Sequence, residues 1–325
     1  MKLEEHISQN ADKRPLGYLG PILDPEEFVL QPLELDEGVY ALMANTPSKD
    51  NNGLIIGETS ALVVDAGFNG AMARKIQEVS HQLTSKPIRY LVNTTYHGDH
   101  TFGNYAFSRD VTIISSSKNK ESMRELEREK RIRSSNLRGN IKAISDVAVW
   151  RRPDIVFQSY MELDLGGQIV QLWHFGPGNA PGDTIVYVPS AKVAWTGNYL
   201  PAAGIPPMLI ERGPNPYIAS LQCLQRTLDL ETIVPGHGPI GPAKPALENL
   251  VAYLKEVRDE VRASIAEKRS LEETLSAYSM SDRLTQPADR AQTQGMQTLI
   301  ANLHRLNVLA TYRMFEADTS ESTTG

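Results

Sequence analysis

The chain has 325 residues, of which 41% are hydrophobic and 22% are charged, which is close to the average for soluble globular proteins. At about 150 residues per domain, this length allows one large domain or two small ones. The 33 basic and 39 acidic residues give a formal net charge of −6, which argues against a dedicated nucleic-acid binder. The single cysteine, Cys223, excludes an internal disulfide framework and a zinc site made of several thiolates.

The N-terminal segment does not resemble a signal peptide. Residues 1–20 mix both charge signs and lack the apolar stretch of a signal peptide. No window reaches the roughly 18 apolar residues that cross a bilayer. We therefore expect a reduced, cytoplasmic protein with no membrane partner. The polar residues 316–325 predict a disordered tail.

The first half of the chain alternates between strand-like and helix-like segments. Apolar runs predict strands at 39–43, 53–56, 60–65, 88–92 and 111–115. Residues 71–83 have the apolar spacing of a helix that faces a core. Residues 117–132 mix charges of both signs, which predicts one solvated surface helix.

The second half repeats this pattern and then becomes helical. Strands are predicted at 168–175, 184–188, 192–196 and 233–234, with a helix at 216–228. Beyond Pro245, helical spacing continues through 246–266, 271–278 and 288–315. We therefore expect one α/β domain at 1–245, followed by a C-terminal helical extension at 246–315.

Three residues with side chains that bind metals follow the predicted strand 88–92. His97, Asp99 and His100 lie within four positions of one another, in a loop that contains Gly98. Loops at strand ends are common places for functional residues. Imidazole nitrogens and carboxylate oxygens are good ligands for Zn²⁺ and Fe²⁺.

The segment LVNTTYHGDHTFGN resembles the HxHxDH signature of the metallo-β-lactamase fold superfamily. Three other segments resemble later parts of its pattern, in the family order: ALVVDAG with Asp65, GPGNAPGDTIVYVPSAKVAWTGN, and IVPGHGP with His237. The resemblance covers about residues 39–240. It implies an αββα four-layer sandwich, in which two mixed β-sheets pack face to face with helices outside.

The chain departs from the family pattern at three positions. Thr95 stands where the first histidine is expected, Asn179 where the third is expected, and Asn198 where the bridging aspartate is expected. Of the residues that would hold the family's first metal, only His97 remains. Asp99, His100 and His237, which match the ligands of the second metal, all remain.

These departures favour a centre with a single metal. Two divalent cations need the bridging carboxylate, and Asn198 replaces it with a neutral amide. A first ion would be held mainly by His97, so we expect that site to be empty or very weak. Asp99, His100 and His237 can hold one divalent ion. Zinc is the first choice, with iron or manganese as alternatives. The other alternative is no metal at all, with these residues kept for packing.

The first functional hypothesis is a metal-dependent hydrolase. One metal-bound water would attack an ester, lactone, thioester, amide or activated aryl ether. Asp99 would orient or deprotonate the nucleophile, and Asn179 or Asn198 would donate to the developing oxyanion. The apolar segment 201–209 is either a wall for an apolar or aromatic small-molecule substrate or a covered loop.

The second hypothesis is a catalytically degenerate subunit with a structural or regulatory role, partnering an active relative. The lost ligands favour it. The extension also carries an apolar stripe at helical spacing, formed by Leu299, Ile300, Leu303, Leu306, Leu309 and Phe315. This stripe either packs on its own domain or forms the interface of a homo- or hetero-oligomer.

Overall fold

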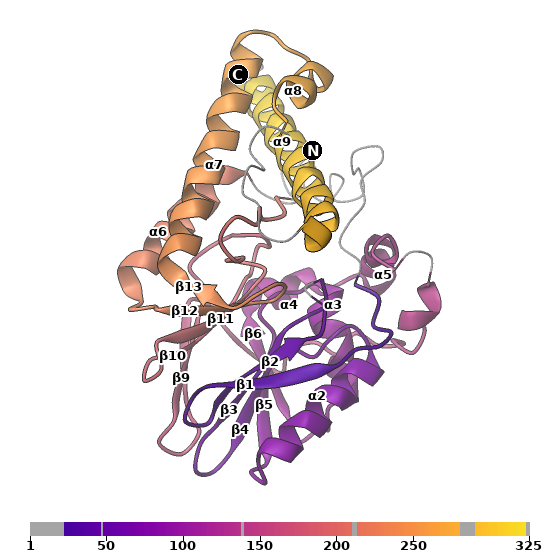
Figure 1. Cartoon of the computed structure of the whole chain (residues 1–325), viewed down its shortest axis with the longest axis vertical. Helices are drawn as coiled ribbons and strands as arrows, with labels where there is room; N and C mark the ends of the chain where they lie inside the picture. Colours follow the sequence, from indigo (N-terminus) through magenta and orange to yellow (C-terminus); the bar gives the residue numbers. More distant parts are fainter. Residues whose placement is uncertain (1–22, 47, 138–139, 210–212, 280–289, 323–325) are drawn as a thin grey trace.

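A computed structural model of the chain describes residues 23–46, 48–137, 140–209, 213–279 and 290–322. Two β-sheets form its lower part in Figure 1, and a group of long helices rises above them. Within the described residues, no helix is both long and apolar enough to cross a membrane.

The first sheet has seven strands, which are neighbours in sequence order. They are β1 (Leu30–Asp36), β2 (Val39–Ala44), β3 (Asn52–Ile56), β4 (Ala61–Val64), β5 (Ile88–Val92), β6 (Thr112–Ser116) and β7 (Ile155–Phe157). Strands β1 to β4 pair antiparallel, and β4 to β7 pair parallel. The sheet is therefore mixed, as predicted.

The second sheet has six strands, in the order β13-β12-β11-β10-β9-β8. They are β8 (Tyr160–Asp164), β9 (Ile169–Trp173), β10 (Ile185–Val188), β11 (Val193–Gly197), β12 (Thr232–Pro235) and β13 (Gly241–Pro242). Only β11 and β12 pair parallel, because the helix α6 (Pro214–Thr227) connects them.

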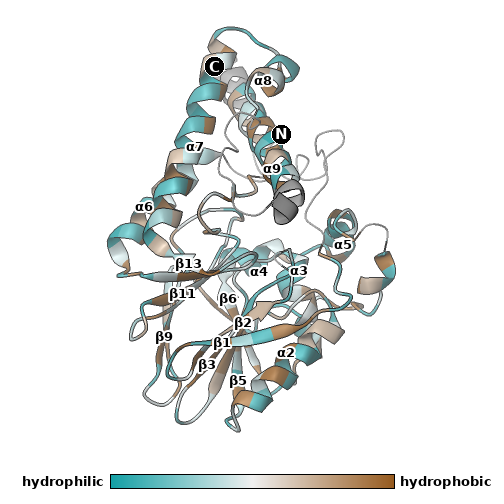
Figure 2. Ribbon diagram, in the orientation of Figure 1, coloured by the Kyte–Doolittle hydropathy of each residue, from teal (hydrophilic) through white to brown (hydrophobic). Residues whose placement is uncertain are grey.

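The central strand β4 is apolar on both faces because each face is covered. In β4, Leu62 and Val64 face the second sheet, whereas Ala61 and Val63 face helix α2 (Gly70–Leu83). This alternation follows the two-residue period of a strand. Helix α2 shows brown apolar patches alternating with teal polar ones in Figure 2.

Helices also cover the outer face of the second sheet. Apolar residues of α6 and of α7 (Ala243–Ala266) share a core cluster with residues of β10, β11 and β12. The order of layers is therefore helix, sheet, sheet, helix, and the predicted four-layer sandwich is confirmed.

The segment predicted as a C-terminal extension contains most of α7, followed by α8 (Leu271–Ala277) and α9 (Arg290–Ser322), and the division of the chain at residue 245 stays a prediction. Ile300, Leu303, Leu306 and Leu309 of the predicted stripe are buried within this one chain. Helix α9 contacts α7 and α8. The stripe therefore packs on its own protein, and oligomer formation through it stays a prediction. Disorder at 316–325 also stays a prediction, and residues 323–325 of that segment lie outside the described part.

The segment 117–132 differs from its prediction. It forms two helices, α4 (Ser117–Ser122) and α5 (Leu126–Ser134), instead of one. Helix α5 is not merely a solvated surface helix, because Glu129, Ile132 and Arg133 are buried. The prediction was wrong here because a mixture of charges in the sequence does not distinguish side chains that pair inside the protein from side chains that face water.

Candidate metal centre

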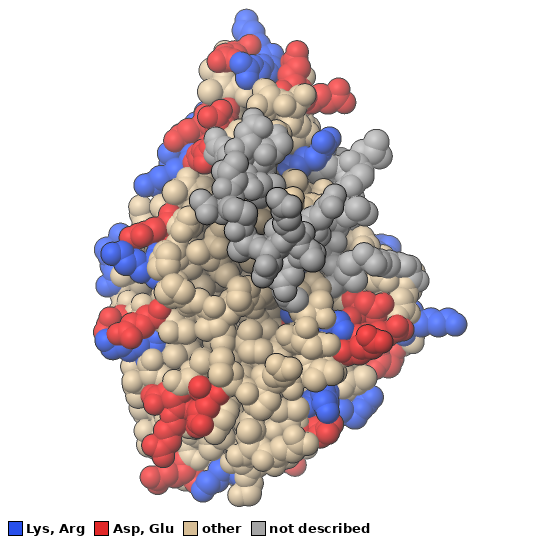
Figure 3. All heavy atoms as spheres, in the orientation of Figure 1, with Lys and Arg blue, Asp and Glu red and all other residues tan. Residues whose placement is uncertain are grey.

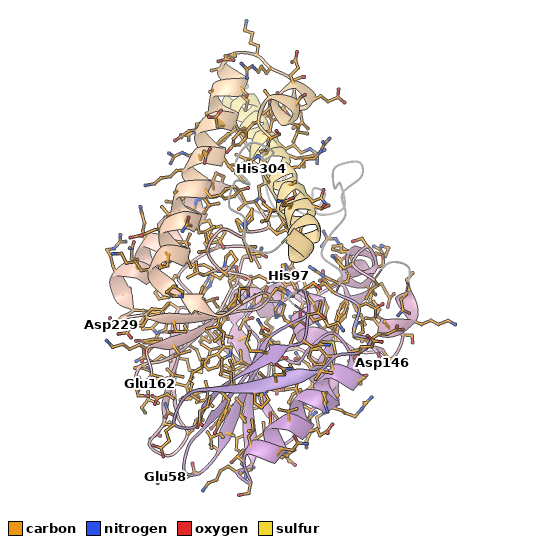
Figure 4. The ribbon with its side chains drawn as sticks, viewed as in Figure 1. Glu58, His97, Asp146, Glu162, Asp229 and His304 are labelled. Carbon is orange, nitrogen blue, oxygen red and sulfur yellow. The ribbon has the colours of Figure 1, made fainter. Side chains whose placement is uncertain are left out.

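The histidines of the motif lie at the end of the sandwich that faces the C-terminal helices. Figure 4 shows His97 at this end, His304 among the helices above it, and Glu58 at the opposite end. His97, Asp99 and His100 follow β5, while His237 follows β12. Strand ends from both sheets thus bring these four residues to the same region, as strand ends commonly do in α/β proteins.

The segment after His97 folds into a single helical turn, α3 (Gly98–Thr101). The His97 carbonyl accepts hydrogen bonds from the His100 N–H at 3.0 Å and the Thr101 hydroxyl at 2.9 Å. The Trp150 indole N–H donates to the Thr101 oxygen at 2.9 Å. The backbone that carries Asp99 and His100 is therefore fixed from several directions.

Asp65 at the end of β4 orients His100. Its carboxylate lies 2.9 Å from His100 Nδ1 and accepts hydrogen bonds from the Thr94 N–H and hydroxyl at 2.8 and 2.6 Å. Asp65 has a φ of 60°, a conformation that aspartate tolerates better than most residues. Because Asp65 contacts Nδ1 of His100, the Nε2 atom of the same ring faces the centre of the site.

Asp50, which the sequence reasoning missed, lies against His237. Its Oδ1 is 3.4 Å from His237 Nδ1. The next residue, Asn51, fixes this approach, because its side-chain amide donates to the carbonyls of Pro235 and Gly238 at 3.0 and 2.8 Å. The loop between β2 and β3 is thereby fastened to the loop that carries His237.

Asp99 lies between the two histidines. Its Oδ2 is 3.8 Å from His100 Nε2 and 3.3 Å from His237 Nε2. Asp50, Asp99, His100 and His237 each offer one possible ligand atom, and these atoms all lie within 4.8 Å of one another. Sequence reasoning had placed three of these four residues in one site.

The other oxygen of Asp99 faces helix α5. Asp99 Oδ1 lies 3.6 Å from Arg133 Nη1. Glu129, one turn earlier, accepts hydrogen bonds from Arg133 Nε at 2.6 Å and from the Gly98 N–H at 2.9 Å. Glu129 therefore joins α5 to the first residue of α3.

Burial and neighbouring charges act in opposite directions on Asp99 and His100. Burial alone would raise the pKa of Asp99, but Arg133 and His100 hold it well below its usual value. Burial alone would lower the pKa of His100, but Asp65, Asp99 and Asp50 raise it to about 10. Both effects strengthen the pairing of opposite charges at the site.

Asp50 and His97 shift towards their neutral forms. Burial raises the pKa of Asp50 to about 7. Burial and the Arg133 guanidinium lower the pKa of His97 well below its usual value. His97 therefore holds a neutral ring within the site.

The positions that depart from the family pattern hold short polar groups. Asn198 Nδ2 lies 3.2 Å from His97 Nδ1 and 3.1 Å from His100 Nε2, so its amide lies between the two rings. Thr95 is fully buried, and among the described residues its hydroxyl has no hydrogen-bond partner. Positions 95 and 198 therefore offer a hydroxyl and a neutral amide where the family has a histidine and an aspartate.

Asn179 contacts the loop 201–209 rather than the histidines. Its amide donates to the Met208 carbonyl at 3.1 Å, and its role as an oxyanion donor stays a prediction. The same loop approaches His237, since a Cβ added at Gly238 would lie 3.4 Å from Ile205 Cδ1. The apolar segment 201–209 therefore borders the candidate site.

The residues present fit one divalent cation. Asp99 Oδ2, His100 Nε2 and His237 Nε2 form a carboxylate and two-imidazole set, as zinc and iron sites use. Buried Asp50 Oδ2 has no hydrogen-bond partner among the described residues. Such an orphaned carboxylate oxygen is rare without a cation nearby.

The chain belongs to the metallo-beta-lactamase superfamily, whose family model matches residues 46–237. This is a superfamily of hydrolases that generally bind divalent metals and act on small molecules. The matched region begins just before Asp50 and ends at His237. It therefore contains every residue of the cluster described above.

Solved structures share the fold at low sequence identity. A metallo-beta-lactamase from Pontibacter korlensis is 17% identical, with a TM-score of 0.55, over 70% of this chain and 99% of that one. The stereoselective inverting sec-alkylsulfatase Pisa1 from Pseudomonas sp. is 13% identical, with a TM-score of 0.65. That match covers 88% of this chain and 50% of the alkylsulfatase, so this chain spans about half the length of that enzyme.

Proposed function

We propose that this protein is a hydrolase that uses one divalent metal ion, held by Asp99, His100 and His237. The convergence of Asp99 Oδ2 with the Nε2 atoms of both histidines carries this proposal. Zinc is the expected ion, with iron or manganese as alternatives. A metal ion bound there would lower the pKa of a water molecule and so supply a nucleophile near neutral pH.

The residues of the chain have distinct roles in this proposal. Asp99 would orient or deprotonate the nucleophile, because its Oδ2 lies at the centre of the cluster. Asn198 can donate N–H groups towards a developing oxyanion from its place beside His97 and His100. Asn179 would support the same oxyanion from the side of the loop 201–209.

The substrate is proposed to be a small molecule with an ester, lactone, thioester, amide or activated aryl ether bond. His237 keeps 24% of its side chain exposed, whereas His100 is fully buried, so substrate would approach from the His237 side. The segment 201–209 lies on that side, and its apolar residues favour an apolar or aromatic substrate. Because the protein shares its fold with a sec-alkylsulfatase, secondary alkyl sulfates are included among the substrates to be tested.

The test combines metal counting with turnover. The purified chain is saturated with zinc, desalted and analysed for bound metal. It is then assayed on chromogenic esters, lactones, thioesters, amides, aryl ethers and alkyl sulfates. We expect about one metal ion per chain and an activity that EDTA removes and zinc restores. Asp99→Asn and His237→Ala should abolish that activity.

Three other outcomes contradict the proposal. A folded chain that binds no metal would favour the alternative role of a structural or regulatory subunit, which the neutral residues Thr95, Asn179 and Asn198 support. Isolation from its native source with a stoichiometric partner carrying the full HxHxDH motif would favour that role too. Two bound metal ions per chain would contradict the single-metal centre itself.

A further inference from the structure

Arg133 is a buried cation beside the candidate metal centre, in a helix that the family motif does not include. We propose that its guanidinium takes the place of the family's first metal ion, as a fixed positive charge that leaves room for one metal only. This inference rests on the proposed function, because it concerns the same centre. With this fixed charge in place, the protein would not need the ligands of a first metal ion.

The two oxygens of Asp99 face opposite neighbours. Oδ2 faces His100 and His237, where a metal ion would bind. Oδ1 faces Arg133 Nη1 at 3.6 Å, with only 4% of the arginine and 2% of the aspartate side chain exposed. One carboxylate is therefore shared between a fixed cation and the candidate metal position, with little water to screen either charge.

The guanidinium is held in place by its helix. Arg133 Nε donates to Glu129 Oε1 at 2.6 Å, and that carboxylate also accepts the Gly98 N–H. With Nε held in this way, Nη1 contributes the contact with Asp99.

The charge of Arg133 also acts on the position of the missing metal. His97, the one remaining ligand of the first site, is buried and lies two residues before Asp99, the partner of Arg133. A divalent ion at His97 would meet the same guanidinium in a buried environment. Asn198 offers it no negative charge in return. Repulsion of this kind is strong where water is excluded.

The experiment restores the missing ligands and varies the cation. The variant Thr95→His/Asn179→His/Asn198→Asp is made with Arg133 intact, with Arg133→Met and with Arg131→Met. Arg131 lies on the same helix and is exposed, so it is a matched control. Each protein is checked by circular dichroism, saturated with zinc, desalted and analysed for metal per chain.

We expect one zinc per chain in the restored variant with Arg133 and in its Arg131→Met control. We expect two when Arg133→Met is added, because the competing charge is gone. Two zinc ions in the presence of Arg133 would overturn the proposal. One zinc in both the Arg133 and the Arg133→Met proteins would overturn it as well.

The double variant Thr95→His/Asn198→Asp keeps the Asn179 contact with Met208. It provides the same comparison if the triple variant does not fold, with the same expected and overturning counts. The zinc count of the natural chain tests the proposed function separately. A natural chain that binds no zinc would contradict the proposed function, whereas the restored variants alone test the role of Arg133.

Discussion

Asp50 Oδ1 lies 3.4 Å from His237 Nδ1, on the side of the ring opposite Asp99. Asp65 has the corresponding place at His100, where it contacts Nδ1 while Nε2 faces Asp99. Both rings are thus backed by a buried carboxylate at Nδ1. Carboxylates in this position commonly orient histidine ligands and increase their basicity.

The change Asp50→Asn should therefore weaken metal binding without unfolding the protein. We expect a loss of about 10- to 100-fold in zinc affinity, measured by competition with a chromogenic chelator. The control is Glu58→Gln, since Glu58 is exposed and lies at the opposite end of the sandwich (Figure 4). Equal affinity of the two variants would show that Asp50 does not orient His237.

The change Asp65→Asn should affect both folding and the metal centre. It replaces an acceptor of the Thr94 N–H, the Thr94 hydroxyl and His100 Nδ1 with an amide that cannot accept all three. We expect the free energy of unfolding in EDTA to fall by about 2–4 kcal/mol, as measured by urea denaturation. Asp229→Asn, at a side chain that is 79% exposed, should leave it within about 0.5 kcal/mol.

Glu129 and Glu127 provide a matched pair on helix α5. Glu129 is buried and accepts from Gly98 and Arg133, whereas the Glu127 side chain is 77% exposed and pairs loosely with Lys130 at 3.7 Å. We expect Glu129→Gln to lower the free energy of unfolding by about 3–5 kcal/mol, since it breaks a buried ion pair. Glu127→Gln should change it by less than about 1 kcal/mol, and a comparable loss in both variants would contradict this.

Asn307 of α9 anchors the loop beside the site. Its side chain accepts from the Leu209 N–H at 2.8 Å and donates to the Pro207 carbonyl at 2.8 Å. Asn307→Ala should speed proteolytic cleavage near 201–209 and lower the free energy of unfolding by about 2 kcal/mol. Asn249→Ala is the control, because exposed Asn249 bonds within its own helix, to Pro245. Unchanged cleavage in Asn307→Ala would rule out this anchoring.

The stability of the metal-free protein should fall as pH rises from about 6.5 to about 10. The pKa of His100 is raised in the folded protein from 6.5 to about 10. The stabilisation that its bound proton provides is therefore complete below about 6.5 and is lost as the pH passes through about 10. Thermal unfolding in EDTA across this range measures the decline.

Two comparisons test this origin of the pH dependence. His100→Gln should flatten the decline, whereas His81→Gln, at an exposed position of α2, should preserve it. Saturating zinc should also flatten it, because the metal competes with the proton for the ring. A decline of equal steepness in His100→Gln would assign the effect to other groups.

Charges of both signs are mixed on the surface of the protein as they are in its sequence. Basic side chains in Figure 3 are interspersed with acidic ones around the edge of the face shown. Because α5 has the same mixture in its sequence, the sequence predicts a solvated helix there. The burial of Glu129 and Arg133 depends on Gly98 and Asp99, which lie far from them in sequence, so charge patterning alone could not reveal it.

The fold and three residues of the cluster could be predicted because short motifs carry them. Asp99 and His100 are adjacent, and His237 lies in its own recognisable segment. Asp50 belongs to no such motif. Its place beside His237 depends on Asn51, which binds carbonyls 184 and 187 residues further along the chain. Only the tertiary fold creates that proximity.

The bond between Asn307 and Leu209 also bears on the order in which the protein is completed during synthesis. The two residues are 98 positions apart, and the sandwich strands all precede Asn307. On the ribosome, both sheets can therefore assemble while the loop next to Asn179 still lacks its anchor. The bonds from Asn307 to this loop can form only after the ribosome has released that part of α9.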